Sequence, residues 1–231
     1  MMSIVDSITD LSSNSWGIFK TVMRGFNITV TILLSAAVIG YLVAFITGLC
    51  RLSSNIVVRF FATAFVEILR GTSLIVQLFW LYYALPIVFN IDLGSDFWVG
   101  AAAIGLNYGA YMSEIVRGSI LAVDEGQSEA ATALNMSSFQ RMRLVIFPQA
   151  LRMMLPEFGN YLIQMLKATS LVSLISLQDW LYHADRIRGN DISSAPLVYF
   201  LLLIFYFILA LPLIWLTRKA EKIAKKGAAH Q

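Results

Sequence analysis

The sequence has few charged residues, one cysteine and only two histidines. Charged side chains make up 13% of its 231 residues, against about 25% in soluble domains, whereas 58% of the residues are hydrophobic. This shortage of charge predicts an integral membrane protein. The lone Cys50 excludes an internal disulfide, and His183 and His230 lie far from it and from each other, so no metal site is expected.

Motifs for nucleotide binding and for hydrolysis are missing as well. No G-x-x-x-x-G-K-[ST] stretch occurs, so an ATPase that acts with this chain must be a separate polypeptide, and the chain itself is expected to bind no ATP, Mg or other cofactor. His183 has no nucleophile motif such as G-x-S-x-G beside it, so a non-catalytic protein is expected. The chain also has no acidic rings and no T-V-G-Y-G filter, which speaks against an ion channel.

Five apolar segments are long enough to cross a hydrocarbon core of ~30 Å at 1.5 Å per residue. They predict an all-α membrane protein with a single transmembrane domain over residues 1–231. The second segment carries Glu67, Arg70 and Gly71 and is expected to bend near Gly71, and small residues in the third predict close helix packing. The five expected spans cover residues 26–49, 60–89, 97–123, 156–176 and 197–216.

The distribution of basic residues predicts the orientation. Residues 1–20 have no basic n-region, so an interfacial or loosely ordered segment is expected there rather than a signal peptide. Five spans put the termini on opposite sides, and the side richer in Lys and Arg is cytoplasmic. That side holds Arg51, Arg59, Arg70, Arg141, Arg143, Arg152, Arg218, Lys219, Lys222, Lys225 and Lys226, whereas the other holds Lys20, Arg24, Arg186 and Arg188. The N-terminus is therefore expected outside and the C-terminus inside. The net charge of +3 follows this topology, so no nucleic acid is expected, and the basic tail is expected to contact anionic lipid.

Residues 124–148 lie between the third and fourth spans and predict two short helices at the membrane surface. Asp124 stands three residues before Gln127, and Ser137 stands three residues before Gln140, which are two capping-box spacings. They predict helices near 125–134 and from 138 toward Pro148, with Asn135 in a left-handed turn between them. The second helix places three apolar side chains on one face: Phe139, Met142 and Ile146. Such a segment suits docking into a groove of a partner protein.

This segment resembles the EAA loop of ABC-importer permeases. The pattern is Glu-Ala-Ala, three residues, Gly, nine residues, Ile, one residue and Leu-Pro, and its counterparts here are Glu129-Ala130-Ala131, Asn135, Val145 and Phe147-Pro148. Flanking blocks are similar to permeases of the polar amino-acid type over about residues 25–215. They include Glu67–Ser73 with Gln77, Asn107–Tyr111, Glu114–Gly118, Gly126-Gln127, Pro148–Ala150, Pro156 and Lys167–Leu171. Ser73 replaces the family's Pro, and Ala168 replaces its Asp.

The resemblance implies a type I permease fold with a coupling helix in the EAA loop, working by alternating access. It also implies a pair of P-loop ATPase subunits, a second permease subunit as homodimer or heterodimer, and an extracytoplasmic substrate-binding protein. Glu129 either braces the first helix, with Ala130 and Ala131 packed beneath the loop, or forms a salt bridge to the ATPase. The coupling residues implied are Glu129, Ala130, Ala131, Asn135, Met136, Ser137, Phe139, Arg141 and Pro148.

Charged residues inside apolar spans are costly, so they pair with one another or line a wet pathway. Glu114 and Arg117 are three apart and can pair on one helix face. Lys167 lies near mid-membrane, where it either binds a substrate carboxylate or lines the pore, or pairs with Glu114 or Glu67 of a neighbouring span. The pathway candidates are Lys167, Thr169, Gln77, Asn107 and Glu114.

Departures within the motifs indicate a substrate. Leu134–Ser137, Gln140–Arg143 and Lys167–Thr169 differ from the usual L-G-M and K-D-T, and the combination is similar to permeases for ectoine and hydroxyectoine. The alternative is a polar amino acid such as glutamine, glutamate or arginine. From other classes, an ion channel, an exporter or a scaffold subunit stays open.

Overall fold

A computed structural model describes residues 16–91 and 94–228. Every regular element of these residues is helical, as the sequence predicts. The expectations for the first fifteen residues fall outside the described part, as do those for the Lys225 and Lys226 side chains. Residues 16–23 are helical, and the helices that follow are α2 (Phe26–Cys50), α3 (Ile56–Gly71), α4 (Leu74–Phe79), α5 (Leu85–Phe89), α6 (Asp96–Leu121), α7 (Glu125–Ala133), α8 (Ser138–Arg141), α9 (Phe147–Ala168), α10 (Trp180–Asn190) and α11 (Ala195–Ala228).

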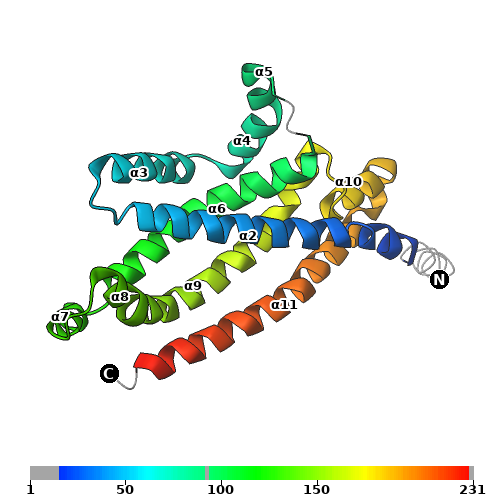
Figure 1. The fold of residues 1–231 in the computed structure, drawn as a ribbon. Helices are drawn as coiled ribbons and strands as arrows, with labels where there is room; N and C mark the ends of the chain where they lie inside the picture. Colours follow the sequence, from blue (N-terminus) through cyan, green and yellow to red (C-terminus); the bar gives the residue numbers. More distant parts are fainter. Residues whose placement is uncertain (1–15, 92–93, 229–231) are drawn as a thin grey trace.

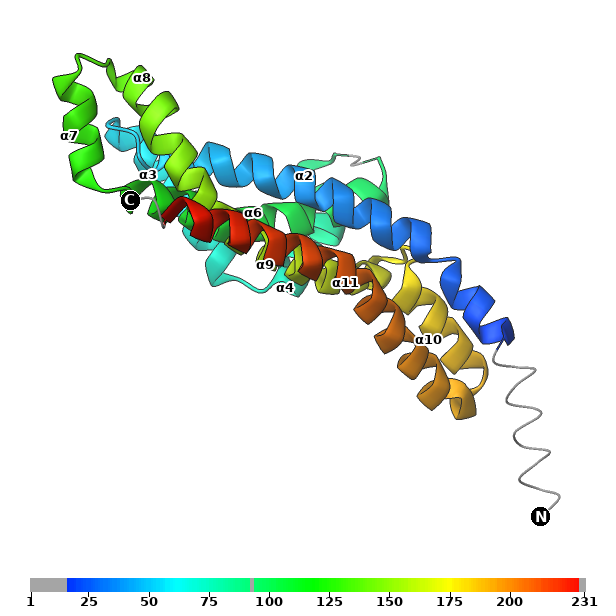
Figure 2. The same ribbon diagram turned by 90° about the horizontal axis from the view of Figure 1, so that it is seen from below.

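The long helices α2, α6, α9 and α11 run along one axis of an elongated molecule (Figure 1). Helices α7 and α8 project from one end, close to the end of α11, and both views agree on this placement. The helical residues 16–23 pack with α10 and the start of α11 at the opposite end (Figure 2).

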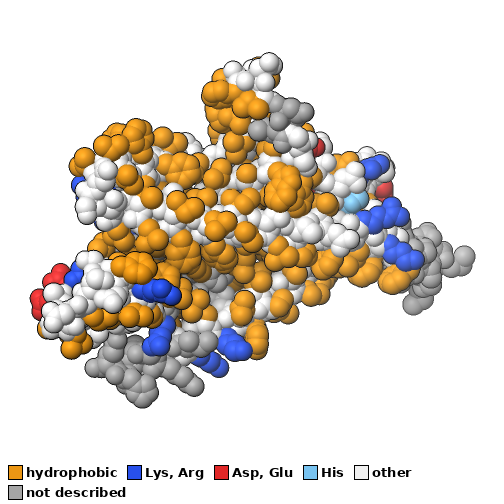
Figure 3. Space-filling view, viewed as in Figure 1, with side chains coloured by type: hydrophobic (Ala, Val, Ile, Leu, Met, Phe, Trp, Pro, Cys, Tyr) orange, Lys and Arg blue, Asp and Glu red, His pale blue; other side chains and the backbone are white. Residues whose placement is uncertain are grey.

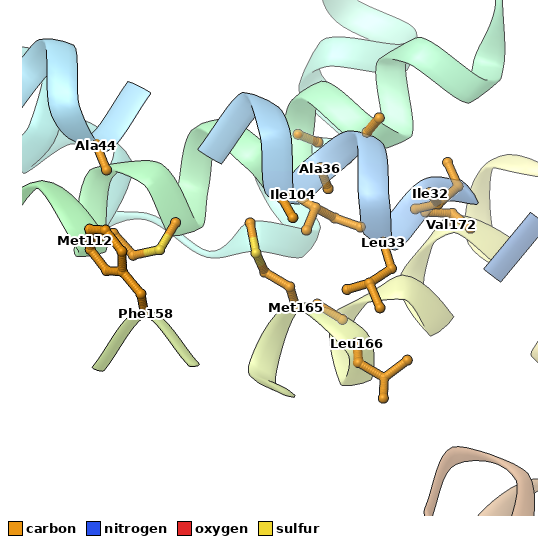
Figure 4. Packing of buried hydrophobic residues seen from close by; sticks show 14 of the residues in the cluster. Ile32, Leu33, Ala36, Ala44, Ile104, Met112, Phe158, Met165, Leu166 and Val172 are labelled. Atoms are coloured by element: carbon orange, nitrogen blue, oxygen red, sulfur yellow. The ribbon is translucent and has the colours of Figure 1, made fainter. Parts of the chain in front are cut away.

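The core lies where α6 is covered by α2 on one side and α9 on the other (Figure 4). Ile32 on α2, Ile104 on α6 and Met165 on α9 are fully buried there. The predicted close approach of small residues is confirmed, because a Cβ at Gly105 would lie 2.7 Å from the Cβ of Ile39 on α2. Any larger side chain on this face of α6 would therefore push α2 away.

The second expected span is broken rather than straight. Helices α3 and α4 are separated by extended Thr72 and Ser73, and the two halves are bent by 107°. The bend near Gly71 was predicted, but its size was not. Beyond it, the chain continues through a π-helical turn at Trp80–Ala84 into α5. Both halves keep most of their apolar side chains exposed, with 66% of Phe60 and 81% of Ile87 accessible.

Two helix boundaries differ from the expectation. The fourth long helix was predicted to begin at Pro156, but α9 begins at Phe147 and Pro156 lies inside it. A π-helical turn, Met142–Ile146, joins α8 to α9, so the second helix of the EAA-like segment does not end at Pro148. The connection between the fourth and fifth expected spans contains a further helix, α10, whose first turn is capped by Asp179.

Within the described residues, two helices are long and apolar enough by composition to cross a membrane, Trp16–Cys50 and Ile192–Lys222, and there are three if α3 and α4–α5 form one bent crossing. Helices α6 and α9 have 26 and 22 residues, enough for ~30 Å of hydrocarbon. Both contribute buried residues to the core, and neither is as apolar as the two helices above. Figure 3 shows the resulting surface, an apolar body with charged side chains gathered toward its two ends.

Candidate functional site

Helix α7 is closed at both ends by contacts within its own segment. The Asp124 carboxylate accepts a hydrogen bond from the Gly126 backbone N–H at 2.8 Å. This is an N-cap, but the reciprocal bond expected from Gln127 is replaced, because the Gln127 side chain accepts from Gln149 at 3.3 Å. At the other end Asn135 has φ 56°, which confirms the predicted left-handed turn.

The turn after α7 is a Schellman motif. The Asn135 N–H donates to Thr132 O at 2.9 Å, and the Met136 N–H donates to Ala131 O at 3.1 Å. Ser137 and Gln140 then form the complete capping box that was predicted for α8. The Arg141 guanidinium donates to Thr132 Oγ1 at 2.8 Å, so a side chain of α8 ties the two short helices together.

The EAA-like segment keeps much of its surface free. Ala131 is 3% exposed and packs as expected, but Ala130 is exposed, so the predicted packing of this pair holds for Ala131 alone. The Glu129 carboxylate is exposed and makes no hydrogen bond or ion pair with any described residue. No bond of Glu129 to a described residue therefore braces α7, and the bond that ties α7 to α8 comes from Arg141. Leu134, Phe139 and Leu144 are between 63% and 76% exposed.

A cluster of five charged side chains joins the ends of α2, α3 and α6. Glu114 Oε1 accepts from Arg51 Nη1 at 2.6 Å and from Arg70 Nη1 at 2.9 Å. Both arginines also approach Glu67, at 3.7 and 3.6 Å. The predicted pair of Glu114 with Arg117 is present but looser, at 3.9 Å. The Arg51 side chain is only 8% exposed, so this cluster is half-buried and fixes α3 against α2 and α6.

The break between α3 and α4 is satisfied by two of the predicted pathway residues. The Gln77 side-chain amide donates to Leu69 O at 2.7 Å and to Thr72 Oγ1 at 2.7 Å. The Asn107 amide, on α6, donates to Leu69 O at 3.2 Å and to Gln77 Oε1 at 3.1 Å. A carbonyl left free where α3 ends thus receives two donors, as backbone at membrane depth requires.

A cavity of about 380 Å³ opens beside this break. Asn107, Tyr108 and Tyr111 contribute from α6, and Asn107 and Tyr111 share a helix face with Glu114 of the charged cluster. The Tyr111 hydroxyl donates to Arg70 O at 3.1 Å, which links the cavity wall to that cluster. All the described side chains that line the cavity are uncharged: Thr72, Ser73, Leu74, Asn107, Tyr108, Tyr111, Tyr161 and Gln164.

Two other pathway candidates lie elsewhere. Lys167 is exposed and pairs with neither Glu114 nor Glu67, so the structural ion pair expected as one alternative is wrong within this chain; the arginines occupy both carboxylates. Thr169 is fully buried, and its hydroxyl donates to Leu166 O at 2.7 Å. It therefore faces the protein interior and does not line the cavity.

Sequence reasoning missed the roles of Arg51 and Arg70 in the charged cluster and the tyrosines of the cavity. Arg70 stands three residues after Glu67, a spacing that could have indicated their pairing. Arg51 is 63 residues from Glu114, and no local pattern joins them. No local pattern indicates the tyrosines of the cavity either, because their meeting depends on how α6 and α9 cross.

Comparisons with known proteins agree with this geometry. The model of the family "Binding-protein-dependent transport system inner membrane component" matches residues 18–223. A probable amino-acid ABC transporter permease of Sinorhizobium fredii, y4tF, is 44% identical over 90% of this chain and 89% of its own. The glutamine transport system permease GlnP of Escherichia coli is 32% identical over 91% of this chain and 95% of its own.

Solved structures show the same arrangement of helices. A crystal structure of an amino acid ABC transporter with histidines is similar at a TM-score of 0.82 and 33% identity, over 92% of this chain and 97% of its own. An inward-facing MetNI methionine ABC transporter is similar at a TM-score of 0.66 and 16% identity, which concerns the fold alone.

Proposed function

The chain belongs to the family of binding-protein-dependent transport system inner membrane components, and we propose that it forms the membrane pathway for a polar amino acid such as glutamine. It is an amino-acid ABC-importer permease with the type I fold. It is a non-catalytic subunit, because ATP hydrolysis in such importers is carried out by a separate ATPase. An ATPase and a substrate-binding protein are therefore its partners in an inner-membrane complex.

The choice of substrate is supported mainly by the 33% identity and TM-score of 0.82 to the amino acid transporter, together with the glutamine permease relatives. These relatives do not support the ectoine preference and favour the alternative of a polar amino acid. The uncharged wall of the cavity beside the α3–α4 break agrees with a substrate whose side chain is polar but neutral. Hydroxyl and amide groups there can both donate and accept hydrogen bonds.

The α7–α8 segment is the proposed docking site of the ATPase. Exposed Phe139, Leu134 and Leu144 offer apolar contacts, and the free Glu129 carboxylate can meet a basic side chain of the partner. The chain is helical without a break from α8 through α9, from Phe139 to Gln164 in the cavity wall. Twenty-five residues at 1.5 Å each span roughly 38 Å. A movement of the docked segment would thus be transmitted to the cavity along one continuous helical path. Such a coupling suits alternating access.

A contact surface for a second permease subunit and an orientation in the membrane are proposed from the exposed apolar residues and the distribution of charge. Helices α3 to α5 leave Phe60, Phe61 and Ile87 exposed, and this apolar face is a candidate contact with a second permease subunit as well as with lipid. The end that carries α7, α8 and the end of α11 is proposed to be cytoplasmic, because it holds most of the basic residues.

Reconstitution with the partner ATPase and binding protein tests the substrate. We expect ATP-driven uptake of glutamine into proteoliposomes and little uptake of ectoine. Gln164→Ala should lower uptake while the complex still assembles, whereas Leu203→Ala, on the exposed side of α11, should leave uptake unchanged. Uptake of ectoine in preference to every polar amino acid would reject the proposal.

A further inference from the structure

A second cavity lies at the end of the molecule far from α7 and α8. It has a volume of about 610 Å³ and is bounded by the junction between residues 16–23 and α2, by the end of the 3₁₀ turn at Thr169–Ile175, and by α10. Its wall is polar and basic. The lining residues are Thr21, Arg24, Ile28, Ser176, Leu177, Gln178, His183, Arg186, Ile187 and Asn190.

Close packing brings the basic side chains of this cavity together. A Cβ at Gly25 would lie 2.3 Å from the carbonyl carbon of Asp179, so only glycine lets the chain after Arg24 touch the start of α10. Ser176, also in the wall, has φ 66°, a left-handed conformation that costs energy for a residue with a side chain. The same contacts that shape the turn therefore place Arg24 opposite His183 and Arg186.

The positive charge of the cavity is not balanced by the described residues. Neither Arg24 nor Arg186 forms an ion pair with any of them, and no acidic side chain among them lines the wall. The nearby Asp185 bonds to Tyr199 and pairs with Arg188 instead. Burial, together with the charges of Arg186 and Arg24, lowers the pKa of His183, so its neutral ring can still donate one N–H.

The second nearby acid is also withdrawn from the cavity. Asp179 is fully buried, and its carboxylate accepts from the Tyr182 N–H at 2.9 Å as the cap of α10. Desolvation raises the pKa of Asp179 to about 7, so its negative charge is reduced at neutral pH. Two guanidinium groups facing a common space then favour an anion, and a phosphate suits their forked donors.

Surface residues beside the cavity have features that are typical of a membrane interface. Residues 16–23 leave 61% of Trp16 exposed, and the Lys20 ammonium lies 5.3 Å from its ring centroid, a combination common at membrane interfaces. Exposed Leu34 on α2 and Phe200 on α11 cover the adjoining body. Basic side chains and the His gather at this end beside apolar surface (Figure 3).

We propose that the cavity lined by Arg24, His183 and Arg186 binds the phosphate of an anionic phospholipid headgroup, whose acyl chains lie against α2 and α11. The interfacial features beside the cavity and its apolar surroundings favour a lipid over a soluble anion. The site is separate from the amino-acid cavity and requires no particular transport substrate.

Lipid titration of the purified permease–ATPase complex tests the proposal, with native mass spectrometry counting bound phosphatidylglycerol or phosphatidylcholine. In the double variant Arg24→Gln/Arg186→Gln, affinity for phosphatidylglycerol should fall roughly thirtyfold, which corresponds to about 2 kcal/mol for the two basic residues together. Binding of phosphatidylcholine should be unchanged. Arg24→Lys/Arg186→Lys keeps the charge and should retain most of the affinity.

Arg188→Gln is the matched control, because Arg188 lies on the same helix but does not line the cavity. It should leave phosphatidylglycerol binding within about twofold of the original, a difference of only about 0.4 kcal/mol. Unchanged phosphatidylglycerol affinity in the Gln double variant would overturn the proposal. Displacement of the lipid by millimolar inorganic phosphate would assign the site to a soluble anion. If the double variant kept its lipid and lost affinity for the substrate-binding protein, the cavity would be a protein-docking site.

Discussion

The α7–α8 segment and the break between α3 and α4 both interrupt long helices with polar residues, but they use those residues differently. At the break, the free Leu69 carbonyl receives Gln77 and Asn107, and Glu114 receives two arginines. On the α7–α8 segment, backbone groups are capped, but the outward side chains stay unused.

This difference indicates that the polar residues at the break stabilise the permease itself, whereas those on α7–α8 are available for association with a partner. Polar groups at membrane depth have no water to bond with, so the break must be satisfied within the chain. On the proposed function the α7–α8 segment lies in water, where its exposed apolar side chains and the Glu129 carboxylate would gain contacts when the ATPase binds. Substitutions at the break should therefore lower the stability of the permease, whereas substitutions on the outer surface of α7–α8 should lower its affinity for the ATPase.

The largest effect is expected at Ala131, where a substitution should both disturb the local fold and weaken association with the ATPase. This residue is 3% exposed and lies beneath the α7 turn, so Ala131→Arg should displace α7 and abolish association with the ATPase. Co-purification of the ATPase measures the result. Ala133→Arg, at an exposed position of the same helix, is the control and should leave α7 folded. A complex of normal yield and activity that carried Ala131→Arg would show that the segment is not the docking site.

The next effect should appear at the charged cluster. Glu114→Gln leaves the 8%-exposed Arg51 without its main carboxylate, and we expect a loss of roughly 2–4 kcal/mol of unfolding free energy, at the low end for a buried pair because Arg70 is partly exposed. Thermal unfolding in detergent measures it. Glu157→Gln, an exposed acid without an ion pair among the described residues, should have no such effect. Equal melting temperatures for the two variants would mean that water replaces the Glu114 carboxylate as the partner of the arginines, so that the cluster adds no stability.

Association alone should change at Phe139. Because this side chain is 70% exposed, Phe139→Ala should leave thermal unfolding unchanged but weaken ATPase binding by about 1–2 kcal/mol, or roughly tenfold. A titration of the permease with the purified ATPase measures the affinity. Phe200→Ala, with a similarly exposed ring on α11, is the control. A loss of melting temperature without a loss of affinity would contradict the division between the two regions.

Local signals were enough to predict the α7–α8 segment. The Ser137–Gln140 capping box and the left-handed Asn135 depend on residues within a few positions, and both are present. The long apolar segments likewise predicted α2 and α6 to within a few residues, whereas α11 continues well past the apolar stretch that predicted it. The residues that carry such features are close in sequence, so no knowledge of the packing is needed.

Contacts between distant helices could not be predicted in the same way. The partner of Arg51 depends on where α2 ends relative to α6, and the bend of 107° depends on which polar groups receive the ends of α3 and α4. For Lys167 the sequence left two alternatives, a place in the pathway or an ion pair with Glu114 or Glu67, and the structure shows Lys167 exposed on α9 without that pair. The rotation of each helix about its own axis decides these cases, and the hydrophobicity of a segment such as α9 does not determine that rotation.

The smallest expected effect concerns the turn between α7 and α8, which is held by backbone hydrogen bonds. Asn135 has φ 56° and is exposed, so Asn135→Gly should stabilise the α7–α8 turn by about 0.5 kcal/mol through relief of the left-handed penalty, whereas Asn135→Val should destabilise it by about 1–2 kcal/mol. Hydrogen exchange of the Asn135 and Met136 amides, which donate to Thr132 and Ala131, reports the change. Exchange should slow in the Gly variant and quicken in the Val variant, while melting of the spans stays constant. If both variants instead lowered the melting temperature, the turn would be coupled to the membrane core, and the separation of docking surface from intramolecular support would not hold.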